Sequence, residues 1–89
     1  MIHKNIQIFG RVQGVGFRYS ARLAARSYGI KGYIRNMPDG SVYLEAEGQE
    51  NNVMEFVKWC RKGPDFAYID HINVINASLE NYESFEVRF

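Results

Sequence analysis

The sequence is poor in the residues that build covalent or metal-stabilised folds, with one cysteine and two histidines. A lone cysteine, Cys60, excludes an internal disulfide, and we expect it to be a small core residue. His3 and His71 lie far apart, without cysteines or carboxylates at ligand spacing, so we expect no metal site. No apolar run of about 18 residues, secretory signal or lipidation motif occurs, so we expect a cytoplasmic protein with no membrane partner.

Acidic residues are missing from the first third of the chain. Residues 1–35 hold seven of the eleven lysines and arginines, and all ten acidic residues follow them. Because the net charge is only +1, this asymmetry favours a small anionic ligand over a nucleic acid. With 46% hydrophobic and 24% charged residues, the composition is typical of a globular protein, and we expect one domain over residues 1–89.

Apolar periodicity predicts the order β-α-β-β-α-β with a short added strand at the C-terminus. The expected strands cover about residues 4–10, 30–36, 42–46, 69–74 and 85–89, and the expected helices begin at Phe17 and Glu50 and end before Gly29 and Gly63. On the first helix, the expected buried stripe is Phe17, Ala21, Ala24 and Tyr28. The fold class is therefore α+β: a ferredoxin-like split βαβ sandwich with a mainly antiparallel sheet and two helices on one face.

The segment Gly10–Arg18 joins the first strand to the first helix and holds three glycines and two arginines. Glycines permit sharp turns that expose backbone N–H groups, and a helix start adds its positive dipole end. Arg18 opposes that dipole unless an anion is present. We therefore predict an anion cradle in the loop Gly10–Phe17, with phosphate-binding residues Arg11, Val12, Gln13, Gly14, Val15, Gly16, Phe17 and Arg18.

A right-handed crossover would make the first two strands run in the same direction, so Arg18 and Asn36 should meet at one edge of the sheet. The predicted catalytic residues are these two. Asn36 would orient an attacking water beside a phosphoryl group held by the loop and Arg18. A neutral amide is a poor general base, so the substrate needs a good leaving group, and an acyl phosphate supplies one because its carboxylate leaves without protonation.

Plainer interpretations exist for each of these residues. Asn36 before a turn is a common strand terminator. Arg11, Arg35, Arg22 and Arg26 are expected to be solvated surface charges. A P-loop is excluded because Gly16 is followed by Phe17 and Arg18 rather than by Lys and Ser or Thr, and the dinucleotide fingerprint lacks its third glycine.

The runs Gly10–Arg18 and Gly32–Asn36, the second continuing through Gly40, Val42 and Gly48, resemble the two signatures of the acylphosphatase family. The resemblance covers essentially the whole chain and implies hydrolysis of carboxyl phosphates without a cofactor. It implies that the loop and Arg18 bind phosphate and that Asn36 orients water. Inorganic phosphate would be a product and a competitive inhibitor, and we expect a monomer. Ile34 departs from the smaller residue usual in the family and should alter packing only.

Three alternatives remain open. One is an inactive relative that binds phosphate without turnover. The chain also resembles the acylphosphatase-like domains of hydrogenase-maturation carbamoyltransferases, which would favour carbamoyl phosphate but belong to much longer chains. A binding module of the same fold could instead stack single-stranded RNA on Tyr19, Tyr33 and Tyr43. The near-zero net charge and the absence of the aromatic-rich RNP pattern argue against RNA.

Overall fold

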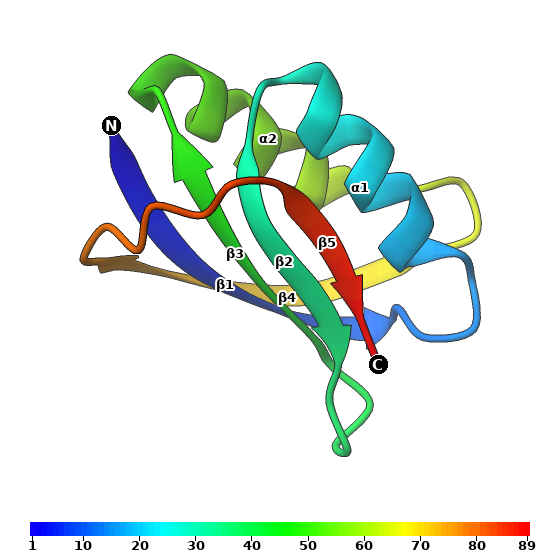
Figure 1. Cartoon of the computed structure of the whole chain (residues 1–89). Coiled ribbons are helices and arrows are strands. Elements are labelled where there is room, and N and C mark those ends of the chain that lie inside the picture. The colour runs from blue at the N-terminus through cyan, green and yellow to red at the C-terminus, as the bar shows by residue number, and fades with distance from the viewer.

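A computed structural model describes residues 1–89 as a five-stranded sheet with two helices on one face (Figure 1). The elements in chain order are β1 (Ile2–Arg11), α1 (Phe17–Ser27), β2 (Lys31–Asn36), β3 (Val42–Gly48), α2 (Glu50–Lys62), β4 (Tyr68–Ala77) and β5 (Phe85–Arg88). The predicted fold class and element order are confirmed. The main differences are at element ends: β1 and β4 are each ten residues long, because they pair with each other beyond the apolar positions that the sequence pattern marks.

The strand order in the sheet is β4-β1-β3-β2-β5. Both β1 and β2 pair antiparallel with β3, so they run in the same direction and their carboxyl ends lie at the same edge. β5 adds to the free side of β2 as a parallel strand. Figure 1 shows that the C-terminus therefore lies beside the end of β2. The predicted meeting of the β1 and β2 ends is correct.

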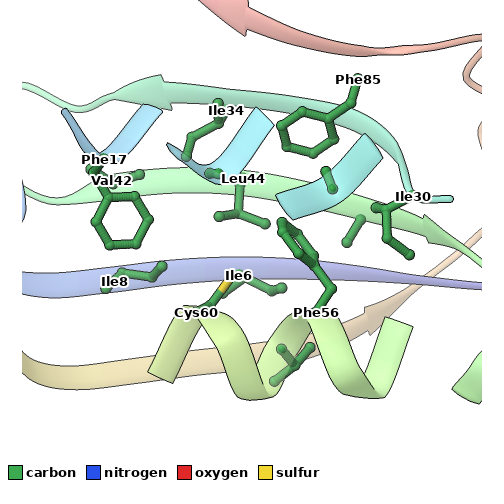
Figure 2. Close-up of a cluster of buried hydrophobic side chains, with 14 of the residues drawn as sticks. Ile6, Ile8, Phe17, Ile30, Ile34, Val42, Leu44, Phe56, Cys60 and Phe85 are labelled. Atoms are coloured by element: carbon green, nitrogen blue, oxygen red, sulfur yellow. The ribbon is translucent and has the colours of Figure 1, made fainter. Parts of the chain in front are cut away.

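The core lies between the sheet and the two helices and contains sixteen buried hydrophobic residues. Figure 2 shows Phe56 and Cys60 pointing from α2 into the core, with Cys60 beside Ile6 of β1, and the centre of the Phe56 ring lies 5.8 Å from that of the Phe85 ring. Burial raises the pKa of the Cys60 thiol, which fits the expected structural role of that residue. Trp59 is partly buried and stacks on Phe56.

The buried stripe of α1 differs from the expected one in the C-terminal half of the helix. The fully buried residues are Phe17, Ala21 and Ala25, whereas Ala24 and Tyr28 are only partly buried against the core. Successive positions four apart drift around the helix axis, so a stripe of this spacing follows a helix that crosses the strands at an angle. Two alanines at the contact allow α1 to approach β2 and β5 closely.

The face of the sheet opposite the helices carries a buried polar cluster around His3, Glu45 and Glu47. The ring nitrogens of His3 lie 3.0 Å from Glu47 Oε2 and 2.8 Å from Glu45 Oε1. Glu47 is only 1% exposed and accepts hydrogen bonds from the backbone N–H groups of Glu80 at 2.6 Å and Tyr82 at 2.9 Å. These bonds hold the β4–β5 connection over the sheet.

The spacing of residues in the sequence does not predict this cluster, because His3 lies on β1 whereas both acids lie on β3. Its acids stand two apart on β3, and the β1–β3 register sets His3 opposite Glu47. No three His, Cys, Asp or Glu side chains of the chain converge in a way that could hold a metal ion. Neither helix is long and apolar enough to cross a membrane.

The hydrogen bonds at Glu47 predict an acid-sensitive stability. Burial alone would raise the pKa of Glu47, but the N–H groups of Glu80 and Tyr82 together with His3 lower it below its ordinary value of 4.5. A carboxylate whose pKa is lower in the folded state stabilises the fold above the unfolded pKa and loses that contribution as the pH falls through the folded pKa. The free energy of unfolding should therefore fall below about pH 5.

Glu47→Gln should cost about 1–3 kcal/mol at pH 7 and flatten this acid dependence. Urea denaturation at several pH values between neutral and strongly acidic measures both effects. Glu55→Gln, on the exposed side of α2, is the matched control and should leave stability and its pH profile nearly unchanged. An unchanged pH slope in Glu47→Gln would contradict the assignment.

Candidate active site

The loop between β1 and α1 is held at its base and open at its tip. Val12 is only 1% exposed and anchors the loop in the core. Gly14 and Gly16 both adopt φ of 75°, a left-handed conformation that other residues reach only with strain. Nothing lies within 4 Å of a Cβ built on either residue, so the backbone conformation, not lack of space, is what requires glycine.

The backbone N–H groups of the loop are free to bind a ligand. None of those from Gln13 to Gly16 donates to a protein acceptor. Gly16 is the N-cap of α1, and no side chain caps this helix end or places an acid in its first turn. The first-turn N–H groups of a helix also lack intrahelical partners. The loop and helix start therefore present adjacent donors and a positive dipole end, as an anion site needs.

Arg18 lies in the first turn of α1 and reaches across to β5. Its Nη1 donates to the carbonyl oxygen of Arg88 at 3.2 Å, and its Cζ lies 4.6 Å from the centre of the Phe89 ring. These contacts orient the guanidinium without neutralising it. Neither Arg88 nor Phe89 could be identified from the sequence as a neighbour of the site, because their proximity depends on the parallel pairing of β5 with β2.

Asn36 ends β2, and its Oδ1 is buried with no hydrogen-bond partner. A buried acceptor without a partner is rare and marks a position where another group is expected to bind. Asn36 and Arg18 line a single pocket of about 150 Å³. The remaining lining residues come from the loop and from the start of α1: Val12, Gly14, Gly16, Phe17 and Tyr19.

Two larger hollows of about 340 and 530 Å³ occur elsewhere on the surface. Neither contains the glycine loop, Arg18 or Asn36. The small pocket is singled out by its chemistry rather than its size: it is lined by the loop with its free amide donors, by Arg18 and by Asn36, whose amide oxygen has no protein partner. Such a set can bind a tetrahedral anion and hold a water molecule beside it.

The predicted phosphate-binding residues do not all line the pocket. Arg11 is exposed at the end of β1, where it pairs with Tyr68 of β4. Val15 packs partly against the core. The side chain of Gln13 turns away from the pocket to the β2–β3 hairpin, where its Nε2 donates to the carbonyl oxygens of Met37 and Ser41, each at 2.8 Å. If Gln13 and Val15 contact a phosphate, they do so through their backbone N–H groups.

Arg22 is not the fully solvated residue that the sequence predicted. It is half-buried, and its Nε is buried without a partner. Its Cζ lies 5.3 Å from the ring centre of Tyr19, which lines the pocket. The spacing of three residues on a helix was the available signal for this contact. Arg26, one turn further on, is exposed as expected.

The aromatic residues considered for RNA stacking are used internally. Tyr33 and Tyr43 lie on the open sheet face, and their hydroxyls donate to Glu45 Oε2 at 3.1 and 2.7 Å. Burial and the hydrogen bond to Glu45 raise the pKa of both hydroxyls. Tyr19 is remote from them on α1. A carboxylate between the two sheet aromatics disfavours a polyanion on this face.

Known proteins similar to this chain point to one family. The family model described as Acylphosphatase matches residues 4–87. An acylphosphatase of Archaeoglobus fulgidus is 48% identical over 89 residues, covering 100% of both chains. The crystal structure of acylphosphatase from Bacillus subtilis covers 100% of both chains with 37% identity and a TM-score of 0.97.

Full-length HypF in its phosphate- and nucleotide-bound form also contains this fold, with a TM-score of 0.89 and 31% identity over 99% of this chain, but the match spans only 12% of HypF. The matches to the two acylphosphatases, by contrast, cover the full length of both chains. In sequence and in fold, the chain belongs to the acylphosphatase family, whose members hydrolyse acyl phosphates.

Proposed function

We propose that the acylphosphatase activity of this chain resides in the pocket between the Gly10–Phe17 loop and the end of β2, with Arg18 and Asn36 as its catalytic residues. The observation that carries the proposal is that Arg18 and Asn36 line one pocket beside free loop amides, and that Asn36 Oδ1 has no hydrogen-bond partner in the protein. Topology brings these groups together although they are far apart in sequence.

The phosphoryl group of a small acyl phosphate lies in the loop, where backbone N–H groups and the Arg18 guanidinium stabilise its oxygens. Asn36 accepts a hydrogen bond from a water molecule through Oδ1 and aims its oxygen at phosphorus, opposite the leaving group. The new bond joins this oxygen to phosphorus, and the bond between phosphorus and the carboxylate oxygen breaks. The products are a carboxylate, which needs no proton to leave, and inorganic phosphate, which keeps both protons of the attacking water.

Three further properties belong to this proposal. Inorganic phosphate competes with substrate, because the cradle binds the group that product and substrate share. The enzyme acts as a monomer, since the loop, Arg18 and Asn36 all come from one chain. It works in the cytoplasm, where the free thiol of the buried Cys60 suits a reducing environment.

Replacing either catalytic side chain should lower turnover. Arg18→Ala and Asn36→Ala are each expected to reduce kcat for acetyl or benzoyl phosphate by about 10²-fold or more, by analogy with the loss of one charge-stabilising donor. The two variants should differ in phosphate inhibition: Arg18→Ala weakens it, because a phosphate ligand is lost, whereas Asn36→Ala leaves it nearly unchanged.

The matched controls are Arg26→Ala, on the exposed side of the same helix, and Asn73→Ala, on the exposed surface of β4. Both should retain wild-type kinetics. Carbamoyl phosphate is assayed in parallel to test the substrate preference suggested by the HypF similarity. Near-normal rates in Arg18→Ala and Asn36→Ala together would overturn the residue assignment.

Phe89→Ala tests the contact that orients Arg18. An exposed cation–π interaction is worth about 0.5–1 kcal/mol, which corresponds to a loss of roughly 2- to 5-fold in kcat/KM if the contact holds the guanidinium in its working position. Steady-state kinetics with benzoyl phosphate measure the loss. Phe66→Ala, which removes another highly exposed aromatic ring, should have no effect. Equal kinetics in Phe89→Ala and wild type would show that Arg18 is oriented without this ring.

A further inference from the structure

The two halves of the proposed site lack a backbone connection at the edge where they meet. The β1–β3 ladder ends at the pair Ile8 and Val42. Beyond that pair, β1 continues to Arg11 against β4 alone, after a register irregularity between Phe9 and Gly10. The loop that follows β1 and the hairpin that follows β2 are therefore not joined by ladder hydrogen bonds.

The side chain of Gln13 bridges this gap. Its Nε2 lies 2.8 Å from the carbonyl oxygen of Met37 and 2.8 Å from that of Ser41. An amide nitrogen has two N–H donors, so both are used. Met37 directly follows Asn36 in the chain, and the bridge therefore attaches the loop to the backbone next to the water-orienting residue.

The β2–β3 hairpin that Gln13 contacts is also held by hydrogen bonds of its own. The Met37 N–H donates to the Ser41 carbonyl at 2.8 Å, and the Gly40 N–H donates to the Met37 carbonyl at 3.1 Å. Asp39 Oδ1 accepts from the Ser41 N–H at 2.9 Å. Gln7 Nε2 donates to Ser41 Oγ at 2.9 Å, which ties the turn to β1 at a point away from the loop.

We infer that the Gln13 side chain is a positioning residue for the proposed reaction: it fixes the distance between the phosphate cradle and Asn36. This inference rests on the proposed function. The backbone N–H of Gln13 belongs to the cradle, while its side chain holds the strand end that carries Asn36. One residue thus joins the anion site to the water site.

The residue type fits this role narrowly. Methionine has a similar length but no donor. Asparagine is one methylene shorter, so its amide would not reach the two carbonyl oxygens that Gln13 contacts at 2.8 Å. Glutamate would place a carboxylate against two carbonyl oxygens and beside the anion. In each variant the two carbonyls keep their bonds from Met37 and Gly40, so the fold should survive the substitution.

The first test is Gln13→Met, compared with Gln7→Met. Both remove a glutamine amide that bonds to Ser41, but only Gln13 belongs to the loop and connects it to the hairpin. Gln13→Met should lower kcat for benzoyl phosphate by about 10-fold, because a small misplacement of reacting groups is costly. Its inhibition constant for inorganic phosphate should stay within about twofold of wild type, since the cradle amides and Arg18 remain. Gln7→Met should keep both values.

Weaker phosphate inhibition with an unchanged kcat would show that Gln13 only shapes the cradle, and the inference would fail. It would fail equally if Gln13→Met matched wild type in both constants. Gln13→Asn serves as a second variant and should shift kcat in the same direction.

A double-mutant cycle separates positioning from general damage. If Gln13 acts through Asn36, Gln13→Met should change kcat by less than about twofold in an Asn36→Ala background. A full 10-fold loss in that background would overturn the inference.

A readout without turnover distinguishes this inference from the proposed function. In NMR titrations with inorganic phosphate, Gln13→Met should keep the shifts of the loop amides and lose the shift of the Asn36 side-chain NH₂ group. In the Gln13→Met variant without phosphate, backbone relaxation should show more motion of the segment Met37–Ser41 than in the wild type. Absence of hydrolysis by the wild type would refute the proposed function, whereas unchanged relaxation in Gln13→Met would refute the bridge.

Discussion

The site depends on the placement of β3 between β1 and β2. Because β1 and β2 run in the same direction on either side of β3, their carboxyl ends stay at one edge and are separated by two strand spacings, about 10 Å. That width leaves room for a phosphoryl group and a water between the structures that follow the two strands. At the same edge β3 begins at Val42, so the turn before it lies within reach of the loop, and Gln13 bonds to it.

Both faces of the sheet serve stability, and the site lies at the edge of the sheet. The helix-covered face supplies an apolar core, and the open face holds the His3, Glu45 and Glu47 cluster beneath the β4–β5 connection. Of the residues in the core and the cluster, only Val12 and Phe17 line the pocket. The free amides, the left-handed glycines and the unpaired Asn36 oxygen are thereby confined to one edge, where their local cost is tolerated by a scaffold that does not rely on them.

The fold and the position of the site could be predicted from sequence because they depend on local patterns. Alternating apolar residues, capping glycines and the handedness of a βαβ crossover were enough to place Arg18 and Asn36 at one edge. The contacts of Arg18 with Arg88 and Phe89 could not be predicted, because they require β5 to pair with β2 rather than with β4. The bridge from Gln13 and the cluster at Glu47 likewise depend on strand register, which apolar periodicity leaves undetermined.

Strand register also explains how a chain with ten acids keeps them away from an anionic substrate. No carboxylate lines the pocket. Three tyrosine hydroxyls and His3 donate to Glu45, and these bonds lower the pKa of its carboxyl although burial alone would raise it. Its charge is thus held and compensated on the far face of the sheet. The arginines at the start of α1 therefore set the local potential at the loop, which favours entry of an anion from solvent.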